Sequence, residues 1–497
     1  MIQIIVKRPM LLCAVVVSIC AALIGIFGII SLLIAIPIIS LFLLFLLDKS
    51  RFVIIALLAI LIFILSFFQI TQKINQTKKF CYTSFTLNLL ATKDPEIYSS
   101  NYGQVEVLAL NNGKLPDRQK FILYFNNSLP VRAGDVFSAS VKIEPIDTGS
   151  SKLYYYSNNV HFKLKLISFN KVNSTNNFYA ILSNIRNSVE DKLFLNMSSD
   201  TAPTMCAITY GDDSYISEEF DTNIRRAGVS HVMVVSGMHL AIIMSGIFAA
   251  LDRLFYNRYL RCLLSAFCVF LICGICGFTM SITRAGLMYV LAAFAPLIFR
   301  ENDSVNTLGT TVCIIIIANP YAIFSLSFLL SVSATYGVIA LAPFYSELLS
   351  RRVHKENFVL RGAIAMVMNT LCAMLMTLPI TIYCFSSVSL IAPLTNLAIS
   401  YPVTWALTIV FYAIIISYVP YIAALSKPLF KIAEFFVKYI NIIINDFGSY
   451  KYSAVNVDKN YFVIAIIVIL LLIGFMYYKQ NNIIFKKKEG KRNGCTV

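Results

Sequence analysis

The stretch Ala227-Gly-Val-Ser-His-Val-Met-Val-Val-Ser-Gly-Met-His-Leu-Ala-Ile-Ile-Met244 carries two of the four histidines of the chain. From His231 onward no charged residue appears until Asp252. This run of roughly 21 residues, at ~1.5 Å rise per residue, matches a hydrocarbon core of ~30 Å. With Ser230 as the N-cap residue, the sequence predicts a single membrane-spanning helix that holds both histidines.

The predicted helix places ionisable and small side chains at membrane depth. Ser236 and His239 are three residues apart and would share one face, while Gly237 between them would let another backbone approach. Ionisable groups at this depth are costly, so they usually line a polar path or pair with each other. The same argument applies to Arg284, the single charge in the apolar region 262–299. The candidates for a pore or transport role are therefore His231, Ser236, Gly237, His239 and Arg284.

Plainer roles compete with these. His231 could cap a helix start at the membrane interface, and Arg284 could extend to the outer surface, where its charge stays hydrated. A zinc site is disfavoured, because His231 and His239 would lie some 80° apart on the helix with no cysteine or carboxylate beside them.

The composition indicates a polytopic membrane protein. The 497 residues have a mean hydropathy of +0.74 and are only 13% charged, against ~25% in soluble domains. The apolar runs predict an α-helical protein of about twelve spans, with three in residues 1–71 and the others in residues 231–478. Expected spans in the second block include 305–318 and 421–445.

Basic residues orient the predicted spans. Lys7 and Arg8 precede the first apolar run, and further basic residues separate the second from the third, so the positive-inside rule places the N-terminus in the cytoplasm. Residues 72–200 are then exported, and the basic tail 479–497 is cytoplasmic. The formal charge of +16 serves this orientation and does not by itself indicate a nucleic-acid partner.

Residues 72–170 have the pattern of a small all-β domain. Apolar and polar residues alternate in five short runs separated by turn residues, which favours an OB-like barrel, although a sandwich fits nearly as well. Residues 171–230 then show the spacing of amphipathic helices at a membrane surface. The expected strands are Ser84–Leu90, Gly103–Leu110, Lys120–Phe125, Asp135–Ile143 and His161–Phe169.

The exported domain has more basic than acidic residues and a run of three tyrosines. OB barrels often bind single-stranded nucleic acid by stacking bases on aromatic rings beside basic side chains. The alternative is that aromatics of the strands, such as Phe121, only fill the barrel core. The DNA-binding candidates are Arg118, Lys120, Tyr154, Tyr155, Tyr156, Lys163 and Lys165.

Several motifs between residues 211 and 320 follow one another in a recognisable order. They are Gly211-Asp212, Arg226-Ala-Gly-Val-Ser-His231, Ser236-Gly-Met-His239, Ser281-x-x-Arg284-Ala285 and Asn319-Pro320. In order and spacing they resemble the ComEC-type competence proteins, channels that bring single-stranded DNA across the bacterial inner membrane. The resemblance covers residues 201–405 well, and residues 80–168 resemble the family's OB-like domain weakly.

The resemblance implies a function and partners. It implies a DNA-translocation channel in the inner membrane, acting with a cytoplasmic helicase-like motor and periplasmic DNA-binding competence proteins, possibly as a homo-oligomer. The sequence has neither a phosphate loop nor the His-x-His-x-Asp-His cluster of the nuclease domain that many relatives carry. We therefore expect no catalytic residues, no metal site and no cofactor.

Two other functions use the same residues. A polytopic solute transporter would also need broken helices and a polar site near the membrane midplane. An intramembrane serine peptidase would use Ser236 as a nucleophile activated by a histidine. The peptidase is disfavoured, because one helical turn rarely aims a base at its neighbour's hydroxyl and the chain has no Gly-x-Ser-x-Gly elbow.

Overall fold

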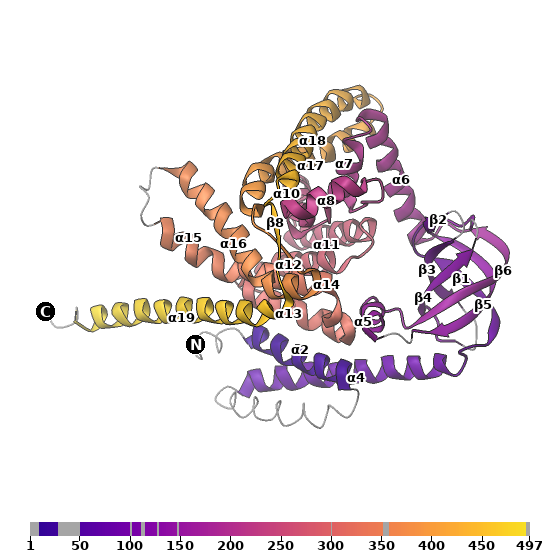
Figure 1. The fold of residues 1–497 in the computed structure, drawn as a ribbon, viewed down its shortest axis with the longest axis horizontal. Helices are drawn as coiled ribbons and strands as arrows, with labels where there is room; N and C mark the ends of the chain where they lie inside the picture. Colours follow the sequence, from indigo (N-terminus) through magenta and orange to yellow (C-terminus); the bar gives the residue numbers. More distant parts are fainter. Residues whose placement is uncertain are drawn as a thin grey trace.

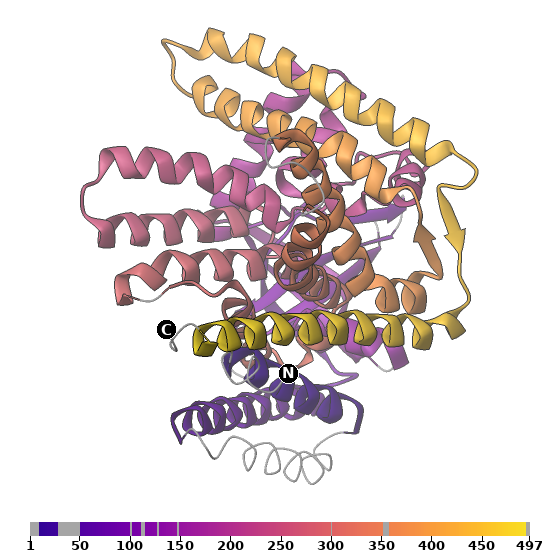
Figure 2. The same cartoon turned by 90° about the vertical axis from the view of Figure 1, so that its left-hand side faces the viewer.

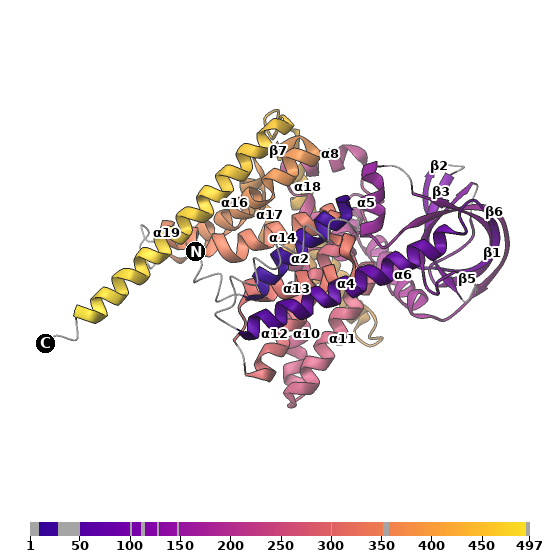
Figure 3. The same cartoon turned by 90° about the horizontal axis from the view of Figure 1, so that it is seen from below.

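The computed structural model shows a β domain at one end of a larger helical domain (Figure 1). Helix α4 (Ser50–Lys78) runs along one side of the helical domain and continues to the β domain (Figure 3). Helix α6 (Phe178–Asn196) lies between the two domains on another side (Figure 1). The described residues are 9–27, 50–99, 102–110, 115–126, 129–146, 149–299, 301–350 and 357–493.

The β domain is a closed barrel. Strand β1 pairs with β3 on one side and β5 on the other, and the ring continues through β6 and β4 back to β3. Every pairing is antiparallel except the parallel one between β4 and β6. The strands are β1 (Ser84–Ala91), β2 (Glu96–Ser99), β3 (Tyr102–Leu110), β4 (Lys120–Asn126), β5 (Asp135–Pro145) and β6 (Phe162–Ser174).

The five strands expected from the sequence form this ring, and β2 is an additional strand at its edge. Ring closure excludes the two separate sheets of a sandwich. Alternate residues point inward, and Phe121, Leu123 and Phe125 of β4 are buried in the barrel core. Aromatic residues at these positions therefore have the core role that alternation predicts.

The N-terminal helices pack against the helical domain. Helix α2 (Pro9–Phe27) lies so close to α13 (Ser304–Ala318) that a Cβ on Gly309 would be 2.6 Å from the backbone of Leu11. Helix α4 (Ser50–Lys78) includes the third expected span. The second expected span lies largely outside the described residues.

Five helices, most of them short, lie between β5 and the start of α10 in the chain. They are α5 (Gly149–Ser157), α6 (Phe178–Asn196), α7 (Ala202–Tyr210), α8 (Glu218–Ala227) and α9 (Ser230–Met233). The Ser217 side chain caps α8, and Gly228 ends it in the left-handed conformation, at φ +73°.

The long helices confirm a polytopic helical membrane protein. In the part of the chain that the structure describes, seven helices are long and apolar enough to cross a membrane. These segments are Gly237–Leu254 (α10), Arg258–Ile275 (α11), Met280–Leu297 (α12 and the following turn), Leu326–Ser350 (α14 to α15), Phe358–Phe385 (α16), Ala392–Ser417 (α17) and Lys459–Met476. The last is the start of α19 (Phe462–Asn493), which lies against α16 (Figure 2).

Two expected spans differ from the structure. The span expected at 305–318 is the 15-residue helix α13, which is shorter than a bilayer core requires. The span expected at 421–445 is the amphipathic helix α18 (Ser426–Ser449). Four charged residues between 427 and 438 lower its hydropathy, so α18 is not among the seven long apolar helices.

Candidate functional site

The histidine segment is broken, contrary to the single helix expected from the sequence. After Gly228 the chain forms only the four-residue helix α9, whose start has no side-chain cap from Ser230. Val234 and Ser236 are then extended, with ψ near 129° and 174°, and α10 begins at Gly237. His231 and His239 therefore lie on different helices. Non-helical backbone of this kind within a membrane protein is typical of segments that line a site or a cavity.

Ser236 and His239 form the cap of α10. The Ser236 Oγ accepts the backbone N–H of Met238 at 3.3 Å, and the Ser236 N–H donates to His239 Nδ1 at 3.0 Å. Glutamate or glutamine usually holds the position that His239 takes in this capping box. Sequence reasoning missed the arrangement because it placed Ser236 inside the helix.

The cap fixes the tautomer of His239. Because Nδ1 accepts a hydrogen bond, the proton of the neutral imidazole is on Nε2. His239 is fully buried, and Nε2 has no hydrogen-bond partner among the described residues. The first turn of α10 therefore contains a buried donor without an acceptor.

Arg284 of α12 approaches the same turn. A Cβ on Gly237 would lie 3.3 Å from Ala285 Cβ and 3.6 Å from Arg284 Nη2, so the atoms that approach this glycine are side chains of α12. Arg284 Nε donates to Ser331 Oγ at 2.9 Å, and Nη1 contacts Met288 Sδ at 3.3 Å. The side chain is buried, so it does not extend to the outer surface as the plainer interpretation required.

His231 lies beside this cluster on the short helix α9. Its side chain is exposed and lies close to Asn396 of α17. The structure thus brings all five pore candidates to the junction between α9, α10, α12 and α17. Sequence reasoning did not single out Ser331 or Asn396, whose roles depend on helix packing and leave no local pattern.

The barrel carries a second candidate site. Lys163 Nζ lies 5.3 Å from the ring centroid of Tyr124 and 4.8 Å from that of Tyr155. The hydroxyls of Tyr124 and Tyr155 are 3.0 Å apart, and Tyr102 stacks on Tyr124 at 5.8 Å with an interplanar angle of 17°. Tyr154 packs edge-on against Tyr155 and is exposed. We call these five residues the tyrosine–lysine face.

The face only partly matches the residues expected from the sequence. Tyr154, Tyr155 and Lys163 belong to it, and the exposed Lys165 pairs with Tyr124 across the strands. Tyr102 and Tyr124 were missed. Tyr124 occupies an outward position of the expected strand Lys120–Phe125, and Tyr102 lies one residue before the expected strand Gly103–Leu110.

Three of the expected DNA-binding residues lie elsewhere. Lys120 forms an ion pair with Glu106 at 2.9 Å. Burial would raise the pKa of Glu106, but Lys120 and Lys93 hold it below its usual value. Arg118 is exposed in the turn before β4, whereas Tyr124 lies near the other end of that strand.

Tyr156, the third such residue, is buried where the barrel meets the helical domain. Its ring lies 4.7 Å from that of His161 and 5.1 Å from that of Tyr321. The Asn319 amide donates to the carbonyls of Tyr156 and Ser157 at 3.2 and 2.7 Å, and its Oδ1 accepts the Tyr321 N–H at 3.0 Å. The side chain at the start of the Asn319-Pro320 motif thus joins α5 to η3 (Pro320–Phe324).

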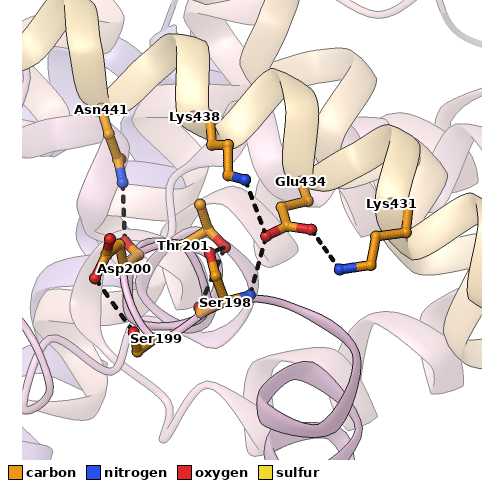
Figure 4. A network of polar contacts seen from close by, with 8 residues as sticks. All are labelled: Ser198, Ser199, Asp200, Thr201, Lys431, Glu434, Lys438 and Asn441. Atoms are coloured by element: carbon orange, nitrogen blue, oxygen red, sulfur yellow. Dashed lines mark hydrogen bonds and ion pairs between the residues drawn. The ribbon is translucent and has the colours of Figure 1, made fainter.

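A polar cluster ties α18 to the corner between α6 and α7 (Figure 4). Glu434 accepts the Ser198 N–H at 3.1 Å and pairs with Lys431 at 2.8 Å and Lys438 at 3.5 Å. The hydrogen bond from Lys431 and those from Ser198 lower the pKa of Glu434 to about 2. Asn441 donates to the Asp200 carbonyl at 2.9 Å. This cluster holds α18 against the corner between α6 and α7.

A partly buried ion pair fixes α6 to the loop after α7. Arg186 bonds to Asp212, and its guanidinium lies 5.0 Å from the ring centroid of Tyr210. Burial would raise the pKa of Asp212, but hydrogen bonds from Ser214 and the charge of Arg186 keep it below its usual value. The Gly211-Asp212 motif therefore anchors the interfacial helix that lies between the barrel and the membrane helices.

Comparison with known proteins bears on these sites. The sequence model of the competence protein family matches residues 208–482, more than half of the chain. The chain belongs to this family. The ComE operon protein 3 of Bacillus subtilis (strain 168) is 26% identical over 245 residues, which are 49% of this chain and 30% of the relative. The resemblance to ComEC-type competence proteins is thereby confirmed. No solved structure matches the chain significantly.

The matched region contains the broken helix and Arg284, whereas the barrel lies outside it. The match also covers less than a third of the relative's length. Membership in the competence family and a membrane location are therefore established, and the family supports a role in DNA uptake.

Proposed function

We propose that this protein conducts single-stranded DNA across the bacterial inner membrane, with the barrel on the exported side receiving the strand. The observation that carries the proposal is the tyrosine–lysine face on a barrel joined to competence-family helices. Aromatic rings interleaved with an ammonium group suit a strand whose bases are unpaired and whose backbone is anionic.

The topology of the barrel supports this role. The ring runs β1-β3-β4-β6-β5 and back to β1, with β4 and β6 parallel. If the five strands of the ring are numbered in chain order without β2, this is the order 1-2-3-5-4-1. We take this order as OB-like, a fold that binds oligonucleotides on one face of its strands. β4 supplies Tyr124 and β6 supplies Lys163, so the face spans the parallel pair.

The site in the membrane domain suits the next step of the path. A strand that crosses the bilayer needs a hydrated path with few strong sites, because tight binding along its whole length would stop movement. The junction of α9, α10 and α12 offers polar side chains and unwound backbone next to helices of membrane-spanning length. His231, Ser236, Gly237, His239 and Arg284 are the residues we assign to it.

The rest of the assignment follows from the proposed path. We assign cytoplasmic termini and an exported barrel. Inward movement of DNA requires work that a cytoplasmic helicase-like motor would supply, and periplasmic DNA-binding proteins would deliver the strand. The protein would act as a channel without catalysis, alone or as a homo-oligomer.

The decisive experiment follows labelled DNA in a strain that lacks this protein. Labelled DNA should still reach the periplasm but not the cytoplasm, and a plasmid copy of the gene should restore entry. Cytoplasmic entry at the normal rate would contradict the proposal and favour the solute transporter. Loss of periplasmic uptake as well would place the protein at an earlier step.

A further inference from the structure

We propose that two copies of this chain associate in the membrane through α18, with Asp200 of each copy paired with the partner's Lys438. The inference concerns assembly and does not rest on the proposed function, which allows one copy or several.

Helices α17 and α18 form a hairpin whose two ends lie together. β7 (Ser387–Ser389), before α17, pairs with β8 (Ala454–Asn456), after α18. The two helices pack along one another, and their lengths of 26 and 24 residues are nearly equal. α18 is not itself a uniformly apolar span, but the hairpin places it alongside α17, which is long and apolar enough to cross a membrane. The side of α18 that points away from the other helices therefore faces the bilayer or another protein.

A polar stripe runs along α18. Its six residues are spaced alternately four and three apart, about one helical turn each, so they lie along one line. The glutamate and the two asparagines bond to α8 and to the α6–α7 corner. The lysine side chains stay largely exposed, at 68% for Lys431 and 59% for Lys438 (Figure 4). The stripe consists of Lys427, Lys431, Glu434, Lys438, Asn441 and Asn445.

The charge of Lys438 is poorly compensated within one copy. The residue is in the middle of α18, about 17 Å along the axis from either end, so its side chain cannot reach past the helix ends to water. The Glu434 carboxylate, 3.5 Å away, is shared with Lys431. An exposed ammonium beside lipid tails is costly. In Figures 1 and 2, α18 lies at the edge of the part of the chain that the structure describes, which leaves the stripe open to a second molecule.

Asp200 supplies a complementary charge. The Asn441 amide donates to the Asp200 carbonyl only three residues along α18 from Lys438, so the two charges lie at nearly the same level. The Asp200 carboxylate is exposed and forms no ion pair with any described residue. Copies of one chain share their orientation in a membrane, so a two-fold axis runs along the membrane normal and keeps equivalent residues at equal depth. Asp200 and the partner's Lys438 can therefore pair twice across one symmetric contact.

The composition of this surface favours a second copy over other occupants. A polyanion such as DNA, or an anionic lipid, would meet the lysines but also the carboxylate of Asp200. Beside the stripe, α18 exposes apolar side chains that can pack against a second protein within the bilayer. These are Ile432, Phe435, Tyr439 and Ile442.

The test mixes two charge-reversed variants of the full-length protein, each with its own fluorophore, in dilute liposomes of zwitterionic lipid. Asp200→Lys alone and Lys438→Glu alone set like charges against each other at both contacts, so each should lower the dimer fraction roughly tenfold. In a heterodimer of the two variants, both contacts join opposite charges. Two-colour dimers should therefore return to near the wild-type level, which also shows that both variants are folded.

A matched control and the contrary outcomes complete this test. Lys459→Glu reverses an exposed lysine in η6 (Lys459–Tyr461) and should dimerise as the wild type does. A monomeric wild type, normal dimers of Asp200→Lys, or a mixture without heterodimers would each overturn the inference. Dimers that form only with anionic lipid would assign the stripe to lipid headgroups instead.

Photo-crosslinking gives a second readout with the native charges in place. p-Benzoylphenylalanine at Phe435 of α18 should crosslink two copies in cells, whereas the same residue at Tyr383 of α16, a similarly exposed aromatic, should not. Crosslinks between copies at Tyr383 alone would place the contact on α16. Crosslinks from Phe435 to DNA would make the stripe part of the path of the strand, and either result would overturn the α18 contact.

Discussion

Ser236 Oγ lies 3.3 Å from His239 Nδ1, and the same nitrogen accepts the Ser236 backbone N–H at 3.0 Å. The contact has the composition of a nucleophile and its base, yet the lone pair of Nδ1 already serves the helix cap. The hydroxyl in turn accepts the Met238 N–H. The pair therefore stabilises the start of α10 and is poorly arranged to activate serine.

Ser236→Ala should be tolerated. It removes one capping hydrogen bond, which costs about 1 kcal/mol of stability, and it keeps a small side chain at the junction. We expect transformation frequency to stay within about threefold of the wild type, in a strain with no other copy of the gene. Complete loss at normal protein abundance would instead favour the peptidase.

His239→Leu should impair DNA entry. Leucine fills a similar volume but removes both the Nδ1 acceptor and the Nε2 donor from the junction. Transformation frequency should fall by more than tenfold while immunoblots show near-normal abundance. Full activity of His239→Leu would remove this residue from the proposed path.

Tyr124→Ala should weaken binding of single-stranded DNA by the barrel. Stacking on one aromatic ring contributes about 1–3 kcal/mol per base, which corresponds to roughly 5- to 150-fold in affinity. Fluorescence anisotropy of a labelled thymidine oligonucleotide on full-length protein measures the loss. Tyr124→Phe keeps the ring and should bind almost normally, so equal affinity of the alanine and phenylalanine variants would exclude stacking.

The sequence predicted the elements of this protein better than their ends and contacts. Period-two alternation identified every strand of the ring, because one face of each is buried. Long apolar runs identified most of the long helices. This criterion wrongly predicted a membrane span at α18, where the residues that face α17 are apolar but the outer face carries lysines.

The break before α10 left no signal in hydropathy. Residues 231–251 are uniformly uncharged, whether or not the backbone stays helical. A finer reading was available, because Ser236 followed by Gly237 is as good a helix start as Ser230. The Ser331 contact with Arg284 and the Asn319 contact with α5 join segments 47 and more than 160 residues apart, so no local pattern could indicate them.

The contact between the barrel and the helical domain should loosen when Asn319 is replaced. Asn319→Ala removes the donor to two carbonyls of α5 and the acceptor for the Tyr321 N–H, and buried groups left unpaired cost about 1–3 kcal/mol. Hydrogen exchange should rise in α5 and η3 while the barrel strands stay protected. Asn158→Ala, at a half-buried residue whose amide donates to the Tyr154 carbonyl of α5, is the control for a change confined to that helix. Unchanged exchange in α5 would mean that the ring contacts alone hold the joint.

The same joint should depend on pH through His161. Burial, reinforced by the positive charge of Lys73, lowers the pKa of His161 from 6.5 to about 4. The imidazole is therefore neutral in the folded protein at a pH where the unfolded chain is already protonated. The contribution of His161 to the stability of the folded state is therefore fully present above about pH 6.5. It is lost as the pH falls toward 4, because the unfolded state binds the extra proton. The loss is at most roughly 3 kcal/mol over this window, at ~1.4 kcal/mol per pH unit.

Hydrogen exchange of α5, corrected for the intrinsic pH effect, should accelerate from pH 7 to pH 5 in the wild type. His161→Phe keeps a ring against Tyr156 and Tyr321 but cannot titrate, so its exchange, corrected for the intrinsic pH effect, should stay flat. The same acceleration in His161→Phe would assign the pH dependence to another group.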